Sequence, residues 1–292
     1  MTFLPFLVLL LLASTTTSAT KNWSSFKKLI GSHRGESPHG LLSVKLYLST
    51  FGYLPKSKFN DTFDATFEKA LMTYQKNFNL DRSGVLDSTT IEQMIQPRCG
   101  YPDVFVQKTT IKGRKLYSYI GKPWPANKVL KYHFNSTGSK IQQNIVKGIF
   151  DEAFKRWSSV ADLSFQMVST KDKADIVLQF FSRDHGDGYP FDGQSGVLAH
   201  AFAPRDGRAH FDSDEFWAPN CTFLLETTDS FDLLTVAVHE IGHILGLGHS
   251  IFQFSVMFPT IASQTRKSTL SIDDKIGIIS LYGMKPWFRI QD

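Results

Sequence analysis

Three histidines and one glutamate lie close together near the C-terminal end of the chain: His239, Glu240, His243 and His249. Histidines four positions apart on a helix project from the same face, so both imidazoles can reach one metal ion. Gly246 permits a turn that ends such a helix, because glycine enters positive φ at low cost, and the returning chain can supply His249. Three protein ligands leave a fourth position for water, which is typical of a catalytic zinc. Glu240 can accept a proton from that water, which is the chemistry of peptide hydrolysis.

This segment resembles the metzincin metallopeptidases, and Ser250 after the third histidine narrows the resemblance to the matrixins, the matrix metalloproteinases. Met257 in SVMFP resembles the Met-turn beneath the zinc of that family, although most members have tyrosine where this chain has Phe258. The resemblance implies an α+β catalytic domain with a twisted mixed sheet and long helices, preceded by a small all-α three-helix prodomain. It also implies a zinc-dependent endopeptidase.

A second candidate metal site lies in HGDGYPFDGQSGVLAHAFAPRDGRAHFDSDEFW, which is also similar to the matrixins. In that family the segment binds a structural zinc and a calcium. Four nitrogen and oxygen ligands without an open position fit a structural zinc. The zinc ligands that the resemblance implies are His185, Asp187, His200 and His210.

Calcium prefers carboxylate and carbonyl oxygens, and this segment offers both. The alternative interpretation is an acidic, solvated loop. The expected ligands are the carboxylates of Asp192, Asp212 and Glu215, with main-chain oxygens of Gly193, Ser195 and Val197 implied by the resemblance.

A second calcium site is the weaker expectation. Asp175 matches one of its ligands, but the loop APRDGRA is shorter than the glycine-rich loop that commonly binds this ion in the family. The short loop is similar to that of plant matrixins, as are the small size and the lack of a C-terminal propeller, so a plant-type member is expected.

Cys99 lies in PRCGYPD (97–103), which resembles the cysteine-switch motif of the matrixins. A thiolate is a better zinc ligand than water, so Cys99 can exclude the catalytic water and keep the enzyme latent. The family pattern implies a salt bridge between Arg98 and Asp103 across the cleft. The rival interpretation is a Cys99–Cys221 disulfide, because an exported protein meets oxidising conditions.

The substrate pocket and the activation step follow from the same resemblance. Matrixins favour a large apolar residue just after the cleaved bond, and residues 258–261 are expected to form the pocket wall. Thr235 is small and precedes His239 by one turn, which indicates an open pocket. Asp273 is the candidate partner for a new N-terminal ammonium, although an ordinary acidic helix start explains it equally well. Arg114–Lys115 is only a weak activation site.

Hydrophobic spacing divides the chain into a helical part and a mixed part. Helices are expected over about 41–95, the third starting at Ser88 with a Ser/Thr cap, whereas residues 20–40 lack periodicity. The clearest helix is predicted at 139–158, with Ile141 and Ile145 on its apolar face. A strand is expected after KPWPANK. Further strands are predicted at 163–168, 174–180 and 197–202, and helices at 232–246 and 271–281.

The N-terminal residues predict export. The apolar run at 3–12 followed by small residues is typical of a secretory signal peptide ending near Ala19. No other segment is long enough to predict stable membrane insertion. The predicted compartment is extracellular, which means the apoplast or cell wall in a plant. Candidate glycosylation sites are Asn22, Asn60, Asn135 and Asn220.

The expected organisation is a signal peptide (1–19), a helical prodomain (20–96), a cysteine-switch linker (97–103), a catalytic domain (104–284) and a tail (285–292). The net charge of +5 is spread thinly over 292 residues, which disfavours a nucleic-acid partner. The expected partners are extracellular protein or peptide substrates and the chain's own prodomain as inhibitor. The alternative function is that of an extracellular binding or structural protein whose metal sites only stabilise the fold.

Overall fold

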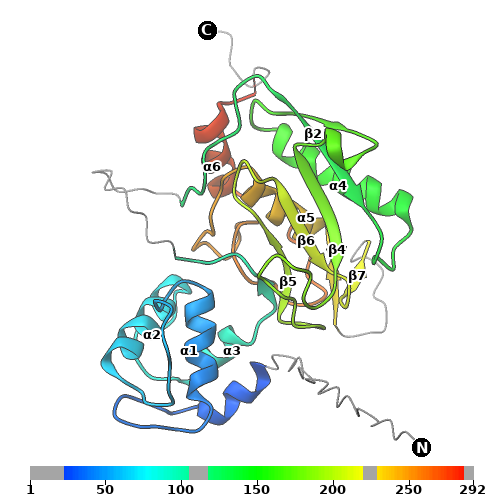
Figure 1. Ribbon diagram of the computed structural model, residues 1–292. Coiled ribbons are helices and arrows are strands. Elements are labelled where there is room, and N and C mark those ends of the chain that lie inside the picture. The colour runs from blue at the N-terminus through cyan, green and yellow to red at the C-terminus, as the bar shows by residue number, and fades with distance from the viewer. Residues whose placement is uncertain (1–22, 105–117, 220–228, 286–292) are drawn as a thin grey trace, which may run out of the picture.

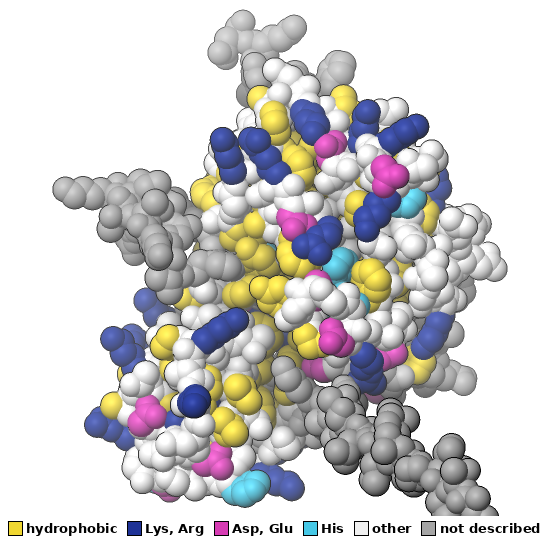
Figure 2. Space-filling view, in the orientation of Figure 1, with side chains coloured by type: hydrophobic (Ala, Val, Ile, Leu, Met, Phe, Trp, Pro, Cys, Tyr) yellow, Lys and Arg dark blue, Asp and Glu magenta, His cyan; other side chains and the backbone are white. Residues whose placement is uncertain are grey.

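The computed structural model describes residues 23–104, 118–219 and 229–285, which form a smaller helical domain and a larger mixed domain (Figure 1). The residues expected to form a signal peptide (1–19) lie outside the described residues, as do Asn22, Arg114–Lys115, Asn220 and Cys221. Each domain has its own hydrophobic core. Hydrophobic side chains gather along the junction of the two domains on the face shown in Figure 2.

The helical domain contains the three expected α-helices. An aspartate at the N-cap position explains where two of them begin. Asp64 accepts a hydrogen bond from Phe67 N–H at 2.8 Å, and Asp87 caps the third helix in the same way, so Asp87 rather than Ser88 is the cap. Residues 20–40 were expected to lack periodicity, but a 3-10 helix there buries Trp23, Phe26 and Leu29 in the core. The elements are η1 (Trp23–Leu29), α1 (Leu41–Thr50), α2 (Ala65–Asn77) and α3 (Ser88–Met94).

The larger domain is built on a six-stranded sheet in the order β1-β5-β6-β4-β2-β3. Among the described strand pairs of this sheet, β5–β6 is antiparallel and the others are parallel. The sheet is therefore mixed, as expected, and mostly parallel. The strands are β1 (Arg98–Cys99), β2 (Val129–Asn135), β3 (Ser164–Met167), β4 (Ile176–Phe181), β5 (Val197–Ala201) and β6 (Arg208–Asp212). A separate pair is formed by β7 (Phe216–Ala218) and β8 (Ser230–Asp232).

Helices α4 (Gln143–Ser158) and α5 (Leu233–Ile244) pack against each other and against the sheet, and α6 (Ile272–Tyr282) follows (Figure 1). The indole of Trp157 on α4 donates a hydrogen bond to the carbonyl oxygen of Val238 on α5 at 2.9 Å. The prediction that α4 starts at residue 139 was wrong. The Ser139 hydroxyl accepts the Ile141 N–H in a turn, and Ile145 is exposed rather than in the core.

Two glycines fix the shape of α5 near its histidines. Gly246 has φ of +105°, which ends the helix in the turn that the sequence predicted. Gly242 lies against the Met-turn, because a Cβ added there would come within 2.3 Å of the Met257 sulfur. No helix within the described ranges has the length and apolar character needed to cross a bilayer.

Candidate metal centres

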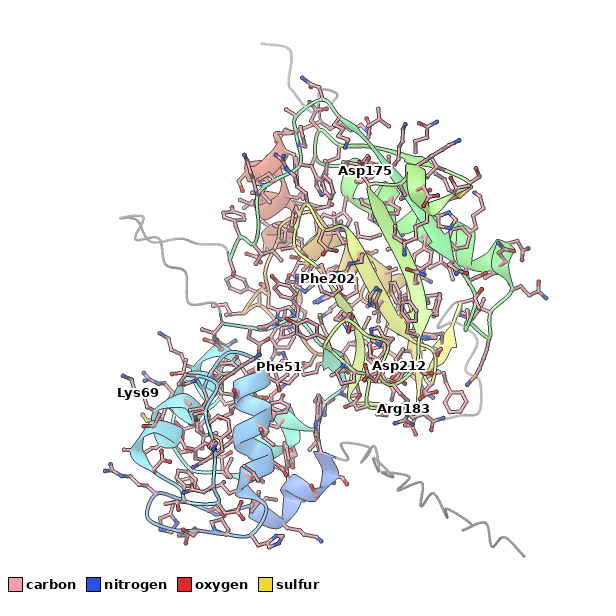
Figure 3. The ribbon with its side chains drawn as sticks, viewed as in Figure 1. Phe51, Lys69, Asp175, Arg183, Phe202 and Asp212 are labelled. Atoms are coloured by element: carbon pink, nitrogen blue, oxygen red, sulfur yellow. The ribbon has the colours of Figure 1, made fainter. Side chains whose placement is uncertain are left out.

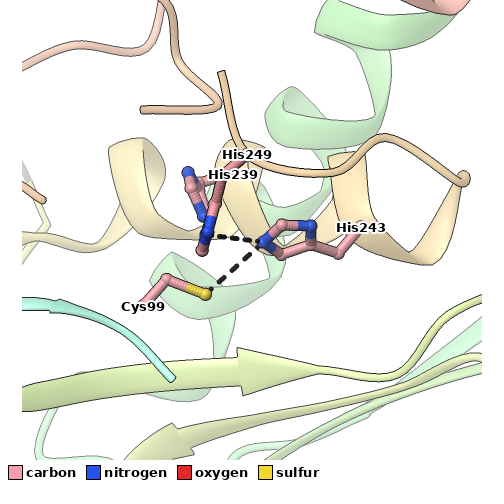
Figure 4. A group of neighbouring side chains, drawn as sticks. All are labelled: Cys99, His239, His243 and His249. Atoms are coloured by element: carbon pink, nitrogen blue, oxygen red, sulfur yellow. Dashed lines mark hydrogen bonds between the residues drawn. The ribbon is translucent and has the colours of Figure 1, made fainter. Parts of the chain in front are cut away.

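His239, His243, His249 and Cys99 converge on one point between α5 and β1 (Figure 4). One ligand atom from each lies within 4.8 Å of the others. Nε2 of His243 is 3.2 Å from Nε2 of His249 and 3.4 Å from the Cys99 sulfur. Ligands of a tetrahedral zinc are separated by roughly 3.3–3.6 Å, given bond lengths of about 2.0 Å to nitrogen and 2.3 Å to sulfur. The four side chains therefore fit a zinc ion.

The second nitrogen of each histidine ring is held by an acceptor. Nδ1 of His239 donates to the Val256 carbonyl and Nδ1 of His243 to the Leu247 carbonyl, both at 2.7 Å. These bonds turn Nε2 toward the shared point, as in most protein zinc sites. Nε2 of His239 is buried and has no hydrogen-bond partner within the described residues. A buried polar atom without a partner is costly, and a metal ion at the shared point would satisfy it.

The histidines are held in the form that binds metal. Burial lowers the pKa of His239 and His243 well below the ordinary value, and it also lowers the pKa of His249. All three imidazoles are therefore neutral near pH 7, and a neutral imidazole is the metal-binding form.

The switch segment (97–103) lies between two walls of a cleft. Its strand β1 pairs in parallel with β5, and Gly100 N–H donates to the Ala199 carbonyl at 2.8 Å. On the other side, Cys99 N–H donates to the Pro259 carbonyl at 2.9 Å, and Ile261 N–H donates to the Pro97 carbonyl at 3.0 Å. The segment is therefore an added strand rather than only a linker, and it uses main-chain groups on both walls of the cleft.

Arg98 and Asp103 form the salt bridge that the sequence predicted, at 2.6 Å. The guanidinium is completely buried and lies 3.3 Å from the ring centroid of Phe51 on the helical domain. The Asp103 carboxylate also accepts a hydrogen bond from Nδ1 of His249 at 2.7 Å, which sequence reasoning missed. Burial opposes ionisation of Asp103, but Arg98 and His249 outweigh it and hold its pKa below the ordinary value. One carboxylate thus joins the switch segment to a histidine of the metal centre.

Cys99 is a free, buried thiol, and Cys221, its partner in the rival disulfide interpretation, lies outside the described residues. Burial raises the pKa of the Cys99 thiol well above the ordinary value. A bound zinc ion deprotonates a coordinated thiol outright. The short distance from the sulfur to His243 favours the ligand interpretation of Cys99.

Glu240 follows the first histidine on α5 and faces Cys99. It is fully buried, and burial raises its pKa to about 8. Access of water after the segment leaves would lower that pKa again.

A small cavity next to Glu240 matches the expected substrate pocket. Its volume is about 20 Å³, which is room for about one water molecule. Thr235 lines it, as do the residues that follow the Met-turn, in agreement with the sequence interpretation. The lining residues are Cys99, Leu198, Thr235, Val236, His239, Glu240, Val256, Phe258, Pro259, Thr260, Ile261 and Lys267.

Phe258 departs from the usual tyrosine of the family, and the structure gives it an unexpected place. Its side chain is 7% exposed and belongs to the hydrophobic core of the helical domain. Its ring centroid lies 5.7 Å from that of Phe78 in an edge-to-face contact. Gln93 on α3 also donates to the Thr260 hydroxyl at 3.2 Å. The helical domain therefore contacts the wall of this cavity.

His185, Asp187, His200 and His210 form the second cluster. Oδ2 of Asp187 is 2.8 Å from a ring nitrogen of each of the three histidines. Burial lowers the pKa of both His200 and His210 to about 4, so these rings are neutral at pH 7. Neutral rings and a carboxylate that point at one another fit a shared cation with no open position.

The acidic residues expected to bind calcium lie near the ends of β4 and β6, where Arg183 and Asp212 are labelled in Figure 3. Burial raises the pKa of Asp212 to about 6 and that of Glu215 to about 8. One oxygen of each is buried without a hydrogen-bond partner in the described chain. A divalent cation would satisfy both groups.

The main-chain part of this calcium site stays a prediction. Val197 N–H donates to Oδ1 of Asp192 at 2.9 Å, and the N–H groups of Gly193 and Ser195 face Asp212 and Glu215. The loop thus surrounds the carboxylates with its N–H groups.

Asp175 lies at the opposite end of the sheet from Asp212 (Figure 3). One of its oxygens accepts a hydrogen bond from the Lys128 ammonium at 2.6 Å, and the other from Lys131 N–H at 2.9 Å. Both carboxylate oxygens of Asp175 therefore already accept hydrogen bonds from the protein, and the second calcium site stays a prediction.

The Met-turn and the start of α6 are tied together by Asp274. Its carboxylate accepts the N–H groups of Val256 and Met257 and forms a capping box with Ser271. The neighbouring Asp273 accepts a hydrogen bond from the Ser250 hydroxyl at 2.7 Å and lines a separate cavity that also contains Asp103. Pairing of Asp273 with a new N-terminus stays a prediction.

Two of the four candidate glycosylation sites lie within the described residues. Asn60 and Asn135 are both exposed. The amide oxygen of each accepts the N–H of the residue two positions later, at 3.1 and 3.0 Å.

Comparisons with known proteins agree with this geometry. The sequence profile described as matrixin matches residues 123–283, and a putative peptidoglycan binding domain matches residues 40–94. Metalloendoproteinase 5-MMP of Arabidopsis thaliana is 44% identical over 92% of this chain and 78% of its own length. Metalloendoproteinase 1 of Glycine max is 42% identical over 87% of this chain and 85% of its own length. Macrophage metalloelastase of Oryctolagus cuniculus is 34% identical over 95% of this chain and 55% of its own length.

The chain belongs to the matrixin family and is a zinc metalloendopeptidase. The fold class expected from the sequence is confirmed, with a helical domain that matches the peptidoglycan-binding profile in front of the matrixin domain.

Proposed function

We propose that this chain is a secreted endopeptidase that is made as a latent zymogen and hydrolyses peptide bonds of extracellular proteins, with Glu240 as the general base. The observation that carries the proposal is the convergence of three histidine nitrogens on one point that the Cys99 thiol also reaches. The matrixin match supports the reaction class, and it weighs against a protein whose metal sites only stabilise the fold.

Zinc bound by His239, His243 and His249 would polarise the scissile carbonyl and lower the pKa of a bound water toward neutrality. Glu240 would accept a proton from the attacking water and return it to the leaving amine. The Val256 and Leu247 carbonyls keep two of the rings oriented during this step. Met257 packs beneath the ligands and supports α5 against Gly242.

The substrate backbone is proposed to take the place of the switch segment. Exposed main-chain groups along a strand edge recognise an extended peptide by adding it as a further strand. The Ala199 and Pro259 carbonyls and the Ile261 N–H now bind residues 97–100. These groups become available to an extended substrate when the segment leaves.

Latency is proposed to depend on residues 20–96 as the prodomain and 97–103 as the cysteine switch, with 104–284 as the catalytic domain. Cys99 excludes water from the metal, and the Arg98–Asp103 ion pair fixes the segment across the cleft. Removal of the residues before about 104 would open the site. Residues 1–19 are proposed as the signal peptide, and residues 285–292 as a tail.

The remaining metal sites are proposed to stabilise the loop between β4 and β6. His185, Asp187, His200 and His210 would hold a structural zinc, and Asp192, Asp212 and Glu215 would hold a calcium. Export to the extracellular space, with glycans at the four sequons, is proposed from the signal-peptide pattern.

The test compares the activated wild type with Glu240→Ala, using the surface change Glu152→Ala on α4 as the control. We expect Glu240→Ala to keep its zinc and to lose peptide cleavage by about 10²–10⁴-fold. Glu152 pairs with Lys155 and Arg156 on the surface of α4, so its variant should cleave like the wild type. Unchanged cleavage by Glu240→Ala would contradict the assigned general base.

A further inference from the structure

Lys267 brings a cation to the substrate pocket, which neither the sequence interpretation nor the family resemblance anticipated. It lines the same cavity as His239 and Glu240. Its main-chain N–H donates to the Thr235 hydroxyl at 2.9 Å, which fixes this part of the chain against the first turn of α5. Its ammonium donates to the Gln253 carbonyl at 3.3 Å and lies 5.3 Å from the centre of the Phe258 ring.

The ammonium has a weak set of partners for a partly buried charge. Within the described residues it makes no ion pair, and its contacts are one carbonyl and one aromatic face. The negative charge of Asp274 stabilises the ammonium from a distance. That carboxylate already accepts hydrogen bonds from Ser255, Val256 and Ser271. Burial lowers the pKa of Lys267 to about 8. A ligand that supplies a hydrogen-bond acceptor would therefore stabilise the charged ammonium.

The other lining residues define the shape of a side chain that would reach this cation. Leu198, Val236, Val256 and Ile261 give the pocket apolar walls. The residue at which these walls would meet a cation is Lys267, which lines the same cavity. A side chain that passes the apolar walls and pairs with Lys267 needs an apolar stem and a polar end.

We infer that Lys267 is a specificity-determining residue, and that the activated enzyme accepts glutamate just after the cleaved bond through an ion pair with this lysine. This inference deepens the proposed function and rests on it, because it assigns a substrate class to the same site. It differs from the purely apolar preference that the family resemblance implies. Glutamine, which offers a neutral acceptor at the same reach, is the weaker ligand of the same pocket.

The pocket must open before such a side chain can enter. Its present volume of about 20 Å³ is room for about one water molecule, which is less than a glutamate side chain needs. Cys99 of the switch segment and Phe258, which the helical domain holds, both line it. Departure of the prodomain removes Cys99 and releases Phe258 from its contacts with the helical domain. The preference for glutamate is therefore expected only in the activated enzyme.

The experiment measures kcat/KM of the activated enzyme for three peptides that differ only after the cleaved bond, with Glu, Gln or Leu there. The variants are Lys267→Met, Lys267→Arg and the control Lys275→Met, an exposed lysine on α6. We expect Lys267→Met to lower the Glu-to-Leu ratio by about 10-fold or more. Lys267→Arg should keep most of the ratio, and Lys275→Met all of it.

The outcomes separate the inference from the proposed function. A Glu-to-Leu ratio that Lys267→Met leaves unchanged, with the Leu peptide cleaved normally, overturns the role of Lys267 alone. A wild type that cleaves the Glu peptide more than about 100-fold more slowly than the Leu peptide also overturns it, whether or not the variants fold. Absence of any Glu240-dependent cleavage contradicts the proposed function and the inference together.

Discussion

The carboxylate of Asp103 lies 2.7 Å from Nδ1 of His249, so the end of the switch segment contacts a histidine of the catalytic centre directly. The same carboxylate pairs with the buried guanidinium of Arg98. Nδ1 of the other two histidines is held by main-chain carbonyls, which stay in place when the prodomain leaves. His249 alone among the three is oriented by a group of the switch segment.

The first prediction concerns Asp103→Asn. Breaking one side of a buried ion pair costs about 3–5 kcal/mol, because the remaining charge stays buried without compensation. We therefore expect the switch segment to open more often, so that the unprocessed zymogen cleaves a peptide substrate and Cys99 reacts with a thiol reagent. Asp151→Asn, which breaks the surface pair with Lys147 on α4, should leave the zymogen latent. Full latency of Asp103→Asn would show that the ion pair does not hold the segment.

The second prediction concerns Phe258→Ala. Replacement of a buried phenylalanine by alanine costs about 3–5 kcal/mol, and Phe258 is buried in the core of the helical domain. We expect the prodomain to dock less tightly, which should appear as faster limited proteolysis of the zymogen between the two domains. The matched control is Phe254→Ala, because Phe254 is 89% exposed. Equal proteolysis rates for both variants would contradict the role of Phe258.

The third prediction concerns His210→Ala in the second metal cluster. Loss of one of four ligands should remove one zinc per chain and lower the melting temperature of the zymogen. The catalytic zinc and the protection of Cys99 should remain. His33→Ala, at an exposed position of the helical domain, is the control for metal content. A zinc count that His210→Ala leaves unchanged would refute the structural zinc.

The fourth prediction concerns calcium and pH. Burial raises the pKa of Asp212 to about 6 and that of Glu215 to about 8, above the ordinary value of about 4. The folded, calcium-free chain therefore binds more protons than the unfolded chain, and its stability falls as the pH rises from about 4 through 8. Bound calcium should remove this loss of stability, because the cation compensates the charge of the ionised carboxylates.

The measurement compares melting temperatures of calcium-saturated and calcium-stripped zymogen at pH 6 and pH 8, with zinc retained. We expect calcium to raise the melting temperature more at pH 8 than at pH 6. Glu215→Gln should reduce that pH dependence, because the amide does not titrate. An equal effect of calcium at both pH values would contradict a site built on these carboxylates.

Local patterns in the sequence predicted most of the fold. The spacing of Val146, Phe150 and Trp157 predicted α4. The predicted range began too early, because the Ser139 hydroxyl accepts the Ile141 N–H in a turn before the helix. The 3-10 helix at Trp23–Leu29 was missed because its buried residues have no α-helical spacing. The addition of β1 to the sheet was missed because a two-residue strand has no periodicity of its own.

The side chains that converge at the two candidate metal centres could be predicted because each belongs to a local motif. The contacts that were missed join residues far apart in the chain. Asp103 and His249 are 146 positions apart, and Phe258 is buried among residues of the helical domain. Lys267 also reaches the pocket through tertiary packing, since no motif marks it. Only the three-dimensional arrangement brings these groups together.

The most direct test of the central claim is X-ray absorption at the zinc edge on the zymogen before and after removal of the prodomain. The account predicts one sulfur ligand at about 2.3 Å in the catalytic zinc of the zymogen, lost on activation as peptidase activity appears. A zymogen whose zinc ions have only nitrogen and oxygen ligands, with Cys99 joined to Cys221, would contradict it.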